Sequence, residues 1–231
     1  MEMNEQEIIT KELQNSGTSW TRNEFFDTNG YLIIKDLCDP NELYHTVPEE
    51  RGVFTYWGDD VNKFHYEKVE GQVVGSLSRY HHPQYKKIHD QIREVLESVI
   101  GRKLYNTYYY DRFYFPGQEL RRHIDRPACE ISVSVHVSDN INENWPFNLK
   151  TPDKFLDKTK SAIIGKGEVV SVDLQKGDGL VYKGCERPHW RDIMPGTLET
   201  INGVQGLYYH QIFFHYVLQD GIRAHHAFDR G

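Results

Sequence analysis

Short segments rich in β-branched and aromatic residues fill the second half of the chain, and they restrict its fold more than any other feature. Residues 131–139 (ISVSVHVSD) alternate between apolar and polar side chains, GEVVSVDL and GLVYKG are short apolar runs bounded by glycine, and LYYHQIFFHYVL is typical of a long final strand. The first half carries helical periodicity instead. Because helices come first and many strands follow, the sequence predicts a mainly β fold, a sandwich or jelly roll with helices packed outside one sheet.

The first hundred residues are predicted to form supporting elements. We expect a short amphipathic helix over residues 1–15, then a second helix, a turn at Asn29-Gly30 and a strand over Tyr31–Lys35. Residues 48–82 show little periodicity, so we expect a long surface excursion with short strands, of a kind that often carries binding. From Pro83 to Ile100, apolar side chains follow the helical period between a proline and a glycine, which predicts a helix.

Composition limits the partners and the compartment of this chain. Its 231 residues suit one domain, and its formal net charge of -7 argues against a nucleic-acid partner, since phosphate-binding surfaces are strongly basic. The first residues lack the apolar core of a signal peptide and no apolar run is long enough to span a membrane, so we expect a cytoplasmic protein with no membrane partner. Three scattered cysteines favour buried free thiols over a disulfide framework. The oligomeric state stays open.

The stretch RRHIDRPACE, residues 121–130, holds the strongest chemical signal. If this stretch is a strand, His123 and Asp125 project from one face, about 7 Å apart along the strand. A third ligand is available in CERPHWRD, where His189 follows another predicted strand. Two imidazoles and one carboxylate form the facial triad of non-haem Fe(II) sites, which leaves the other coordination positions open. A His-x-Asp pair alone is a weak signal, so its sequence context decides.

That context resembles the prolyl 4-hydroxylase-like family of 2-oxoglutarate- and Fe(II)-dependent oxygenases. Residues 114–125 (YFPGQELRRHID) are similar to the family's Y-x-x-G-x-x-x-x-x-H-x-D strand entry. Residues 131–139 lie where the family reads like ATLLLYLND, and residues 176–190 (KGDGLVYKGCERPHW) are similar to its Gly-Asp turn, strand and distal histidine. The resemblance covers residues 108–217 and follows the family's motif order.

The resemblance implies a fold, a metal and a reaction. The implied fold is a single domain of residues 1–231, in which residues 1–100 give helical support and a substrate loop and residues 101–220 form a double-stranded β-helix core, a jelly-roll and cupin-like architecture. The implied catalytic metal ligands are His123, Asp125 and His189. The implied cofactors are Fe(II), 2-oxoglutarate as co-substrate and O2, with ascorbate as an optional reductant. The implied reaction hydroxylates a C–H bond, in a prolyl or other side chain of a protein or peptide, and releases succinate and CO2.

The residue that would anchor 2-oxoglutarate departs from the family pattern. The family places an arginine or lysine at the start of the last strand, whereas this chain has no basic residue there except Arg191, two residues after His189, and then only His210. Arg191 is the first candidate, because a guanidinium binds a carboxylate through two parallel hydrogen bonds. The alternative is that Arg191 pairs with Asp192 or Glu186 on the surface.

Three more side chains are candidates for binding the co-substrate. His136 lies where the family often has a tyrosine that donates to 2-oxoglutarate, Tyr114 matches the tyrosine of the strand entry, and His210 lies in the last strand. Alternation places His136 on one face of its strand with three serines, and this polar face either lines the cavity or lies in solvent. Arg126, directly after Asp125, is expected to orient that carboxylate without binding the metal itself.

Other classes of function stay open. The missing late arginine or lysine favours a non-catalytic metal- or sugar-binding jelly roll, and a cupin-type dioxygenase would use iron without 2-oxoglutarate. Within the oxygenase class, the substrate is a protein or peptide, or else a small molecule, because loop conformation decides this point and no sequence pattern encodes it.

Overall fold

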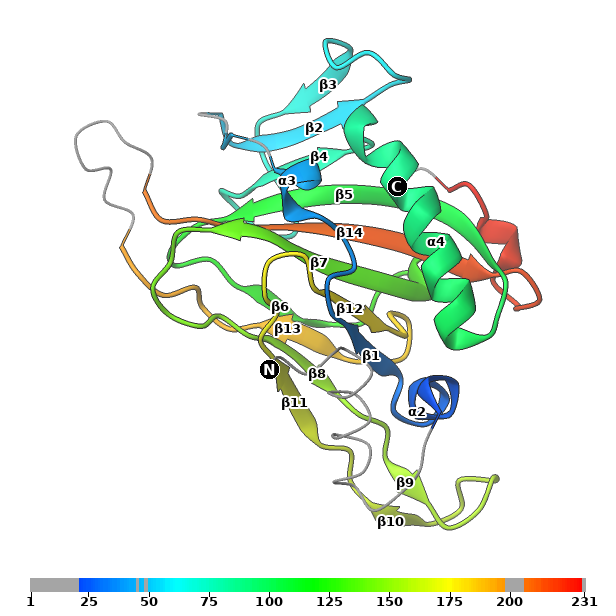
Figure 1. Ribbon diagram of the computed structural model, residues 1–231. Helices are drawn as coiled ribbons and strands as arrows, with labels where there is room; N and C mark the ends of the chain where they lie inside the picture. Colours follow the sequence, from blue (N-terminus) through cyan, green and yellow to red (C-terminus); the bar gives the residue numbers. More distant parts are fainter. Residues whose placement is uncertain (1–20, 45, 48–49, 198–205, 230–231) are drawn as a thin grey trace, which may run out of the picture.

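The computed structural model describes residues 21–44, 46–47, 50–197 and 206–229, and most of its regular elements are strands (Figure 1). The helix expected over residues 1–15 lies outside the described residues. The helices are α2 (Arg22–Asn29), α3 (Pro40–Leu43) and α4 (Lys86–Ile100), with 3-10 turns at Pro83–Tyr85, Pro127–Cys129 and Ala224–His226. The strands are β1 (Tyr31–Ile34), β2 (Gly52–Tyr56), β3 (Phe64–Glu67), β4 (Leu77–Tyr80), β5 (Leu104–Tyr114), β6 (Leu120–His123), β7 (Ile131–Asp139), β8 (Phe147–Lys150), β9 (Lys154–Phe155), β10 (Ile163–Gly165), β11 (Val169–Val172), β12 (Gly179–Tyr182), β13 (His189–Arg191) and β14 (Tyr209–Leu218).

The strands form two main sheets. The large sheet has eight strands in the order β1-β12-β7-β14-β5-β4-β2-β3, and its neighbours run antiparallel except for β2 and β4. The small sheet has four antiparallel strands in the order β11-β8-β13-β6. β9 and β10 pair with each other as a separate hairpin.

Four strands of the large sheet, β12, β7, β14 and β5, face the small sheet across a buried interior. Phe147 of β8 packs with Tyr182 of β12, and Tyr114 of β5 packs in one cluster with Leu120 of β6. From β5 to β14 the chain passes repeatedly between the two sheets. This arrangement is a double-stranded β-helix, so the prediction of a mainly β, jelly-roll fold with supporting helices is confirmed.

Helix α4 covers the outer face of the large sheet (Figure 1). Its buried apolar residues recur at helical spacing and belong to one core cluster with residues of β5, β7 and β14; they are Ile88, Ile92, Leu96 and Ile100. Gly101 ends the helix at φ +67, a conformation that favours glycine, and its N–H donates to the carbonyl of Glu97. The helix predicted from Pro83 to Ile100 is confirmed, although its first three residues form a 3-10 turn.

The turn predicted at Asn29-Gly30 also forms. Helix α2 begins after Thr21, whose hydroxyl accepts the N–H of Glu24 while the Glu24 carboxylate accepts the N–H of Thr21. Gly30 then reverses the chain at φ +78. The predicted strand follows as β1, which pairs with β12 at the edge of the large sheet.

The region from residue 48 to residue 82 extends the large sheet. Its short strands β2, β3 and β4 continue that sheet beyond β5, and short strands were expected in this region. Periodicity could not locate β3 and β4, because β3 is exposed at every residue and β4 is buried at three of its four residues, so neither alternates.

Strand β7 separates an apolar face from a polar face. Val133 and Val135 belong to the core cluster beneath α4, whereas Ser132, Ser134 and His136 point into the interior between the sheets. All of these side chains are buried. The interpretation that the polar face lines the interior is therefore confirmed, and the solvent-facing alternative is wrong.

Two further predictions concern membrane-spanning helices and the state of the cysteines. None of the helices described is long and apolar enough to cross a bilayer. The three cysteines are free thiols, as predicted, with Cys129 buried and Cys38 and Cys185 partly buried.

Candidate metal centre

The structure brings His123, Asp125 and His189 together between the two sheets. His189 begins β13 and pairs in register with His123, the last residue of β6. Asp125 lies beyond the strand, and its N–H donates to the carbonyl of Gly184 at 2.9 Å. The expectation that one strand carries both His123 and Asp125 is wrong, because β6 ends at His123 and the backbone contact with Gly184 places the carboxylate instead.

The three side chains present their ligand atoms to a common point. One ligand atom from each residue lies within 4.8 Å of the others. Oδ1 of Asp125 is 3.5 Å from Nε2 of His123 and 3.4 Å from Nε2 of His189. The His189 side chain is 2% exposed and that of His123 is 26% exposed, so the point is open on the His123 side.

Hydrogen bonds determine which nitrogen of each imidazole is free. Nδ1 of His123 lies 2.7 Å from the carbonyl oxygen of Arg121, and Nδ1 of His189 lies 2.9 Å from that of Arg187. A carbonyl oxygen only accepts, so in each neutral ring Nδ1 carries the proton and Nε2 keeps its lone pair. Both lone pairs therefore lie beside Asp125, as a metal ion requires.

The electrostatics of the triad favour a bound cation. Burial alone would raise the pKa of Asp125, but His123 and His189 donate to it whenever their rings are protonated, and this holds that pKa well below its usual range. Burial alone would lower the pKa of His123, yet the protonated ring donates to Asp125 and to the Arg121 carbonyl, and these contacts raise its pKa. Asp125 is thus an ionised carboxylate set between two imidazoles.

Residues that the sequence analysis did not select support Asp125. Oγ of Ser132 donates to Oδ2 of Asp125 at 2.8 Å, and Nδ1 of His215 lies 3.0 Å from the same hydroxyl. Because Ser132 gives its single proton to Asp125, His215 donates to Ser132. A Cβ at Gly184 would lie 2.3 Å from Oδ2 of Asp125, so glycine permits this close approach. Arg126 pairs with an aspartate near the C-terminus, so the expectation that it orients Asp125 is wrong.

A second group of potential ligands shares Asp125. Asp125, Cys129 and His215 also have ligand atoms within 4.8 Å of one another. Burial raises the pKa of the Cys129 thiol, which is 3.2 Å from the Tyr108 hydroxyl, and a protonated thiol is a poor ligand. The group with two imidazole lone pairs is the better metal site, and its nitrogen and oxygen donors suit Fe(II).

Arg191 lies two residues after His189 on β13, and both side chains are buried in the interior. Its guanidinium lies over the rings of Trp145 and Tyr209, at 4.6 and 4.5 Å from their centroids. It donates to the Trp145 carbonyl and to the Tyr209 hydroxyl, while its Nε has no hydrogen-bond partner among the described residues. The alternative of a surface ion pair is wrong, because only 2% of Arg191 is exposed.

Arg191 differs from the other buried arginines in its charge balance. Arg79 pairs with Asp111, and Arg112 pairs with Glu70 at 2.9 Å. Within the described ranges Arg191 has no such carboxylate partner. A buried guanidinium without a counter-charge is costly, so its surroundings suit an anionic group supplied from outside the chain. The strand spacing places Arg191 about 7 Å from His189, within reach of one small dicarboxylate.

Tyr114 and His136 face the same interior as Arg191. The Tyr114 ring meets the edge of Trp145, with 5.1 Å between centroids. His136 stacks on Tyr209 at 4.4 Å, but its two ring nitrogens already face a backbone carbonyl and the Asp139 carboxylate. Each of these residues therefore contacts a ring that also contacts Arg191, Trp145 in the case of Tyr114 and Tyr209 in the case of His136.

His210 lies on the other face of the large sheet. Its Nε2 is 2.7 Å from Oδ2 of Asp111, in a buried network that includes Arg79. The adjacent residue, Gln211, takes the interior face of β14 and donates to Ser134 at 2.8 Å. The expectation that His210 binds the co-substrate is wrong, because the register of β14 points it away from the triad.

Two further residues that the sequence analysis missed reach the triad from β5 and from the β3–β4 connection. Arg112 is fully buried and donates to Oε1 of Gln72 at 2.8 Å and to Glu70 at 2.9 Å. Nε2 of Gln72 lies 3.3 Å from Nε2 of His123. The arginine inside the aromatic run YYYDRFYF was a usable signal, because a charge in a buried strand needs a partner. No local pattern marks Gln72.

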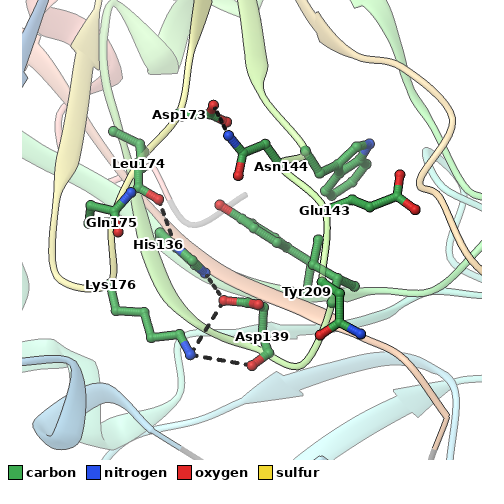
Figure 2. A pocket seen from close by; sticks show the side chains of 12 residues that line it. His136, Asp139, Glu143, Asn144, Asp173, Leu174, Gln175, Lys176 and Tyr209 are labelled. Atoms are coloured by element: carbon green, nitrogen blue, oxygen red, sulfur yellow. Dashed lines mark hydrogen bonds and ion pairs between the residues drawn. The ribbon is translucent and has the colours of Figure 1, made fainter.

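A separate cavity of about 580 Å³ is lined by residues that include His136 and Tyr209 (Figure 2). None of the three triad residues lines it. Its wall carries the carboxylates of Asp139, Glu143 and Asp173 and the ammonium group of Lys176, and Tyr209 lies between it and Arg191. Three carboxylates against one lysine repel a dianion, so this cavity does not suit a dicarboxylate.

Comparison with known proteins identifies the fold. No protein-family model matches the sequence, and no curated protein is significantly similar to it. A prolyl-4-hydroxylase from Pseudomonas putida is 13% identical, with 84% of this chain and 95% of that chain covered and a TM-score of 0.50. An oxidoreductase of the 2OG-Fe(II) oxygenase family from Burkholderia pseudomallei is 12% identical, with 94% and 93% covered and a TM-score of 0.51. HygX from Streptomyces hygroscopicus, with nickel and 2-oxoglutarate bound, is 14% identical, with 86% and 87% covered and a TM-score of 0.50. At these identities the likeness shows the fold, which is that of 2-oxoglutarate- and Fe(II)-dependent oxygenases.

Proposed function

We propose that this protein is a 2-oxoglutarate- and Fe(II)-dependent oxygenase that hydroxylates a C–H bond. The observation that carries the proposal is the convergence of His123, Asp125 and His189, with one unprotonated nitrogen from each neutral imidazole and one ionised carboxylate at a common point. Such a donor set suits Fe(II) and leaves coordination positions for other ligands. The fold shared with known oxygenases supports the same proposal.

In this proposal each residue has a separate task. His123, Asp125 and His189 hold the ion, and Fe(II), O2 and 2-oxoglutarate supply the oxidising chemistry, with succinate and CO2 as by-products. Arg191 binds the distal carboxylate of 2-oxoglutarate, because its guanidinium is buried without an internal counter-charge. The rings around Arg191, Trp145 among them, exclude water from the bound co-substrate.

Arg191 can take the place of the arginine or lysine that the family pattern has at the start of the last strand. The family carries its anchoring cation on the last strand, whereas here the last strand contributes the Tyr209 hydroxyl, which accepts from Arg191 at 3.2 Å. The positive charge is thus supplied from β13 and supported from β14. This supports an oxygenase over a non-catalytic jelly roll.

For the substrate we propose a side chain of a protein or peptide, prolyl residues included. Within the described residues, strand β3 is an edge strand of the large sheet, all of its residues are exposed, and it presents Phe64 and Tyr66 to solvent. An exposed edge can bind an extended peptide through main-chain hydrogen bonds. The chain that follows β3 leads directly to Gln72 at the triad. A small molecule is the second candidate, because HygX has also been solved with hygromycin B bound.

An anaerobic titration tests the proposed activity. Protein loaded with Fe(II) is titrated with 2-oxoglutarate while the charge-transfer absorbance of the iron-bound keto acid is recorded, and succinate is measured after air is admitted. We expect a saturable absorbance change and slow succinate release without added substrate, and His123→Ala and Asp125→Ala should lose both. Iron binding with neither signal would overturn the proposal, and O2 consumption without succinate would favour a cupin-type dioxygenase.

A further inference from the structure

Gln72 places a carboxamide directly against the triad. It belongs to the connection between β3 and β4, and the residue is exposed. Its Nε2 lies 3.3 Å from Nε2 of His123, and its Oε1 lies 2.8 Å from a terminal nitrogen of Arg112. One carboxamide thus bridges a buried guanidinium and a triad imidazole.

The chemistry of the two partners determines which way this carboxamide points. A guanidinium has only donors, so the oxygen of Gln72 faces Arg112 and its NH2 group faces His123. His123 gives its Nδ1 proton to a backbone carbonyl, so Nε2 of the neutral ring accepts. Gln72 therefore donates an N–H to the lone pair that a metal ion would use.

Arg112 holds the oxygen end of Gln72 in place. The Arg112 and Glu70 side chains are 0% and 5% exposed and pair at 2.9 Å, and Nε of Arg112 donates to Ser78 at 2.9 Å. Glu70 in turn accepts the backbone N–H of Val73, so the connection folds around the guanidinium. Gln72 is exposed, yet its donor end is kept beside His123.

We propose that Gln72 has two successive roles at the triad. In the metal-free protein it occupies the lone pair of His123, and once an ion is bound it donates to an oxygen atom of the keto acid on that ion. The ion must displace the Gln72 N–H from Nε2 of His123, while Arg112 keeps the released donor next to the open coordination positions. An N–H beside an anionic oxygen makes a strong hydrogen bond. The second role rests on the proposed oxygenase function, and the first does not.

The two roles predict opposite changes in one variant. Gln72→Leu removes both hydrogen bonds at similar side-chain volume. It should bind Mn(II) about 2- to 10-fold more tightly than the wild type, because the ion no longer displaces an internal hydrogen bond. The Mn(II)-loaded variant should then bind 2-oxoglutarate about 10-fold more weakly, because a hydrogen bond to a charged oxygen is lost. Both affinities are measured by isothermal titration calorimetry.

Gln118→Leu is the matched control. Gln118 donates at 3.2 Å to the carbonyl of Val74, which lies in the same connection as Gln72, but Gln118 makes no hydrogen bond to a triad residue. Both affinities should stay at the wild-type values in this variant. If Gln72→Leu is unstable, Gln72→Ala, which adds no bulk, repeats the comparison.

The possible results separate the two roles from each other and from a structural effect. Unchanged or weaker Mn(II) binding in Gln72→Leu would overturn the first role. Loss of loop structure would weaken the binding of Mn(II) and of 2-oxoglutarate together, so it cannot produce the tighter Mn(II) binding that the first role predicts. Unchanged 2-oxoglutarate binding would overturn the second role. If the wild type binds Mn(II) but no 2-oxoglutarate, the oxygenase proposal and the second role have failed, and the Mn(II) comparison still decides the first role.

Discussion

Replacing Arg191 by methionine should separate the stability of the protein from its affinity for 2-oxoglutarate. The guanidinium is buried among the rings of Trp145, Tyr209 and Phe147 and has no carboxylate partner in the described part of the chain. Methionine is unbranched and adapts its shape to apolar surroundings, so it can fill the same space without a charge. Arg191→Met therefore removes the proposed anchor while leaving the packing nearly intact.

The expected magnitude follows from these contacts. Removing one partner of a buried, hydrogen-bonded charge pair costs about 2 to 5 kcal/mol, which corresponds to a roughly 30- to 4,000-fold higher Kd for 2-oxoglutarate. In the ligand-free protein the variant loses two hydrogen bonds, worth about 1 kcal/mol each, and avoids the burial of an unpaired charge. Its free energy of unfolding should therefore stay within about 2 kcal/mol of the wild-type value.

Calorimetric titration of the metal-loaded protein and thermal unfolding measure the two quantities. At 2-oxoglutarate concentrations about 100 times the wild-type Kd, the ligand should add about 2.7 kcal/mol to wild-type stability, or roughly 5 to 11 °C in Tm. The same concentration should add less than about 1 kcal/mol to Arg191→Met. Arg191→Lys, which keeps the charge but loses the paired donors, should fall between them. An Arg191→Met variant with a wild-type Kd for 2-oxoglutarate would refute this reasoning.

The remaining predictions concern the support of the triad and two buried histidines. Ser132→Ala should weaken Mn(II) binding about 10- to 100-fold in calorimetry, because Asp125 loses the donor on its second oxygen. Gly184→Ala should lower the free energy of unfolding in urea by about 1 to 3 kcal/mol, because the added Cβ would lie 2.3 Å from Oδ2 of Asp125. Burial lowers the pKa of His215 to about 4 and that of His89 to about 3. The unfolded chain, with histidine pKa values near 6.5, therefore binds more protons below about pH 6.5, so stability in urea should fall on acidification toward pH 4. These two histidines together contribute up to about 2.7 kcal/mol per pH unit.

Matched variants decide each of these predictions. Ser134→Ala removes a buried hydroxyl from the same face of β7 that makes no hydrogen bond to the triad, and it should keep wild-type metal affinity. Gly71→Ala adds a Cβ with no atom within 4 Å and should keep wild-type stability. His89→Gln should reduce the pH dependence, since it removes one of the buried histidines whose pKa is lowered. Equal effects in the paired variants, or stability that rises on acidification, would contradict the assigned contacts.

The triad and the core strands were predictable because their signals are local. His123 and Asp125 are close in sequence, His189 follows the recognisable strand β12, and the alternation of β7 places its serines and His136 on one face. Local patterns also define α4, whose apolar spacing and final glycine are complete within one segment.

Other features depend on contacts that no local pattern encodes. Nine of the ten residues of β14 are buried, so alternation could not show that Gln211 faces the interior and His210 faces away. Gln72 and Arg112 meet across a sequence separation of 40 residues, through a connection whose path depends on the buried ion pair of Glu70. The cation of Arg191 was visible in the sequence, but its lack of a counter-charge became clear only from its surroundings.

A crystal structure of the protein with Mn(II) and 2-oxoglutarate, grown without O2, tests the central claim most directly. Mn(II) takes the place of Fe(II), and its anomalous scattering locates the ion. We expect the ion to be bound by Nε2 of His123, a carboxylate oxygen of Asp125 and Nε2 of His189, with the distal carboxylate of 2-oxoglutarate on Arg191. An ion held by Cys129 and its neighbours, or 2-oxoglutarate in the acidic cavity of Figure 2, would contradict the account.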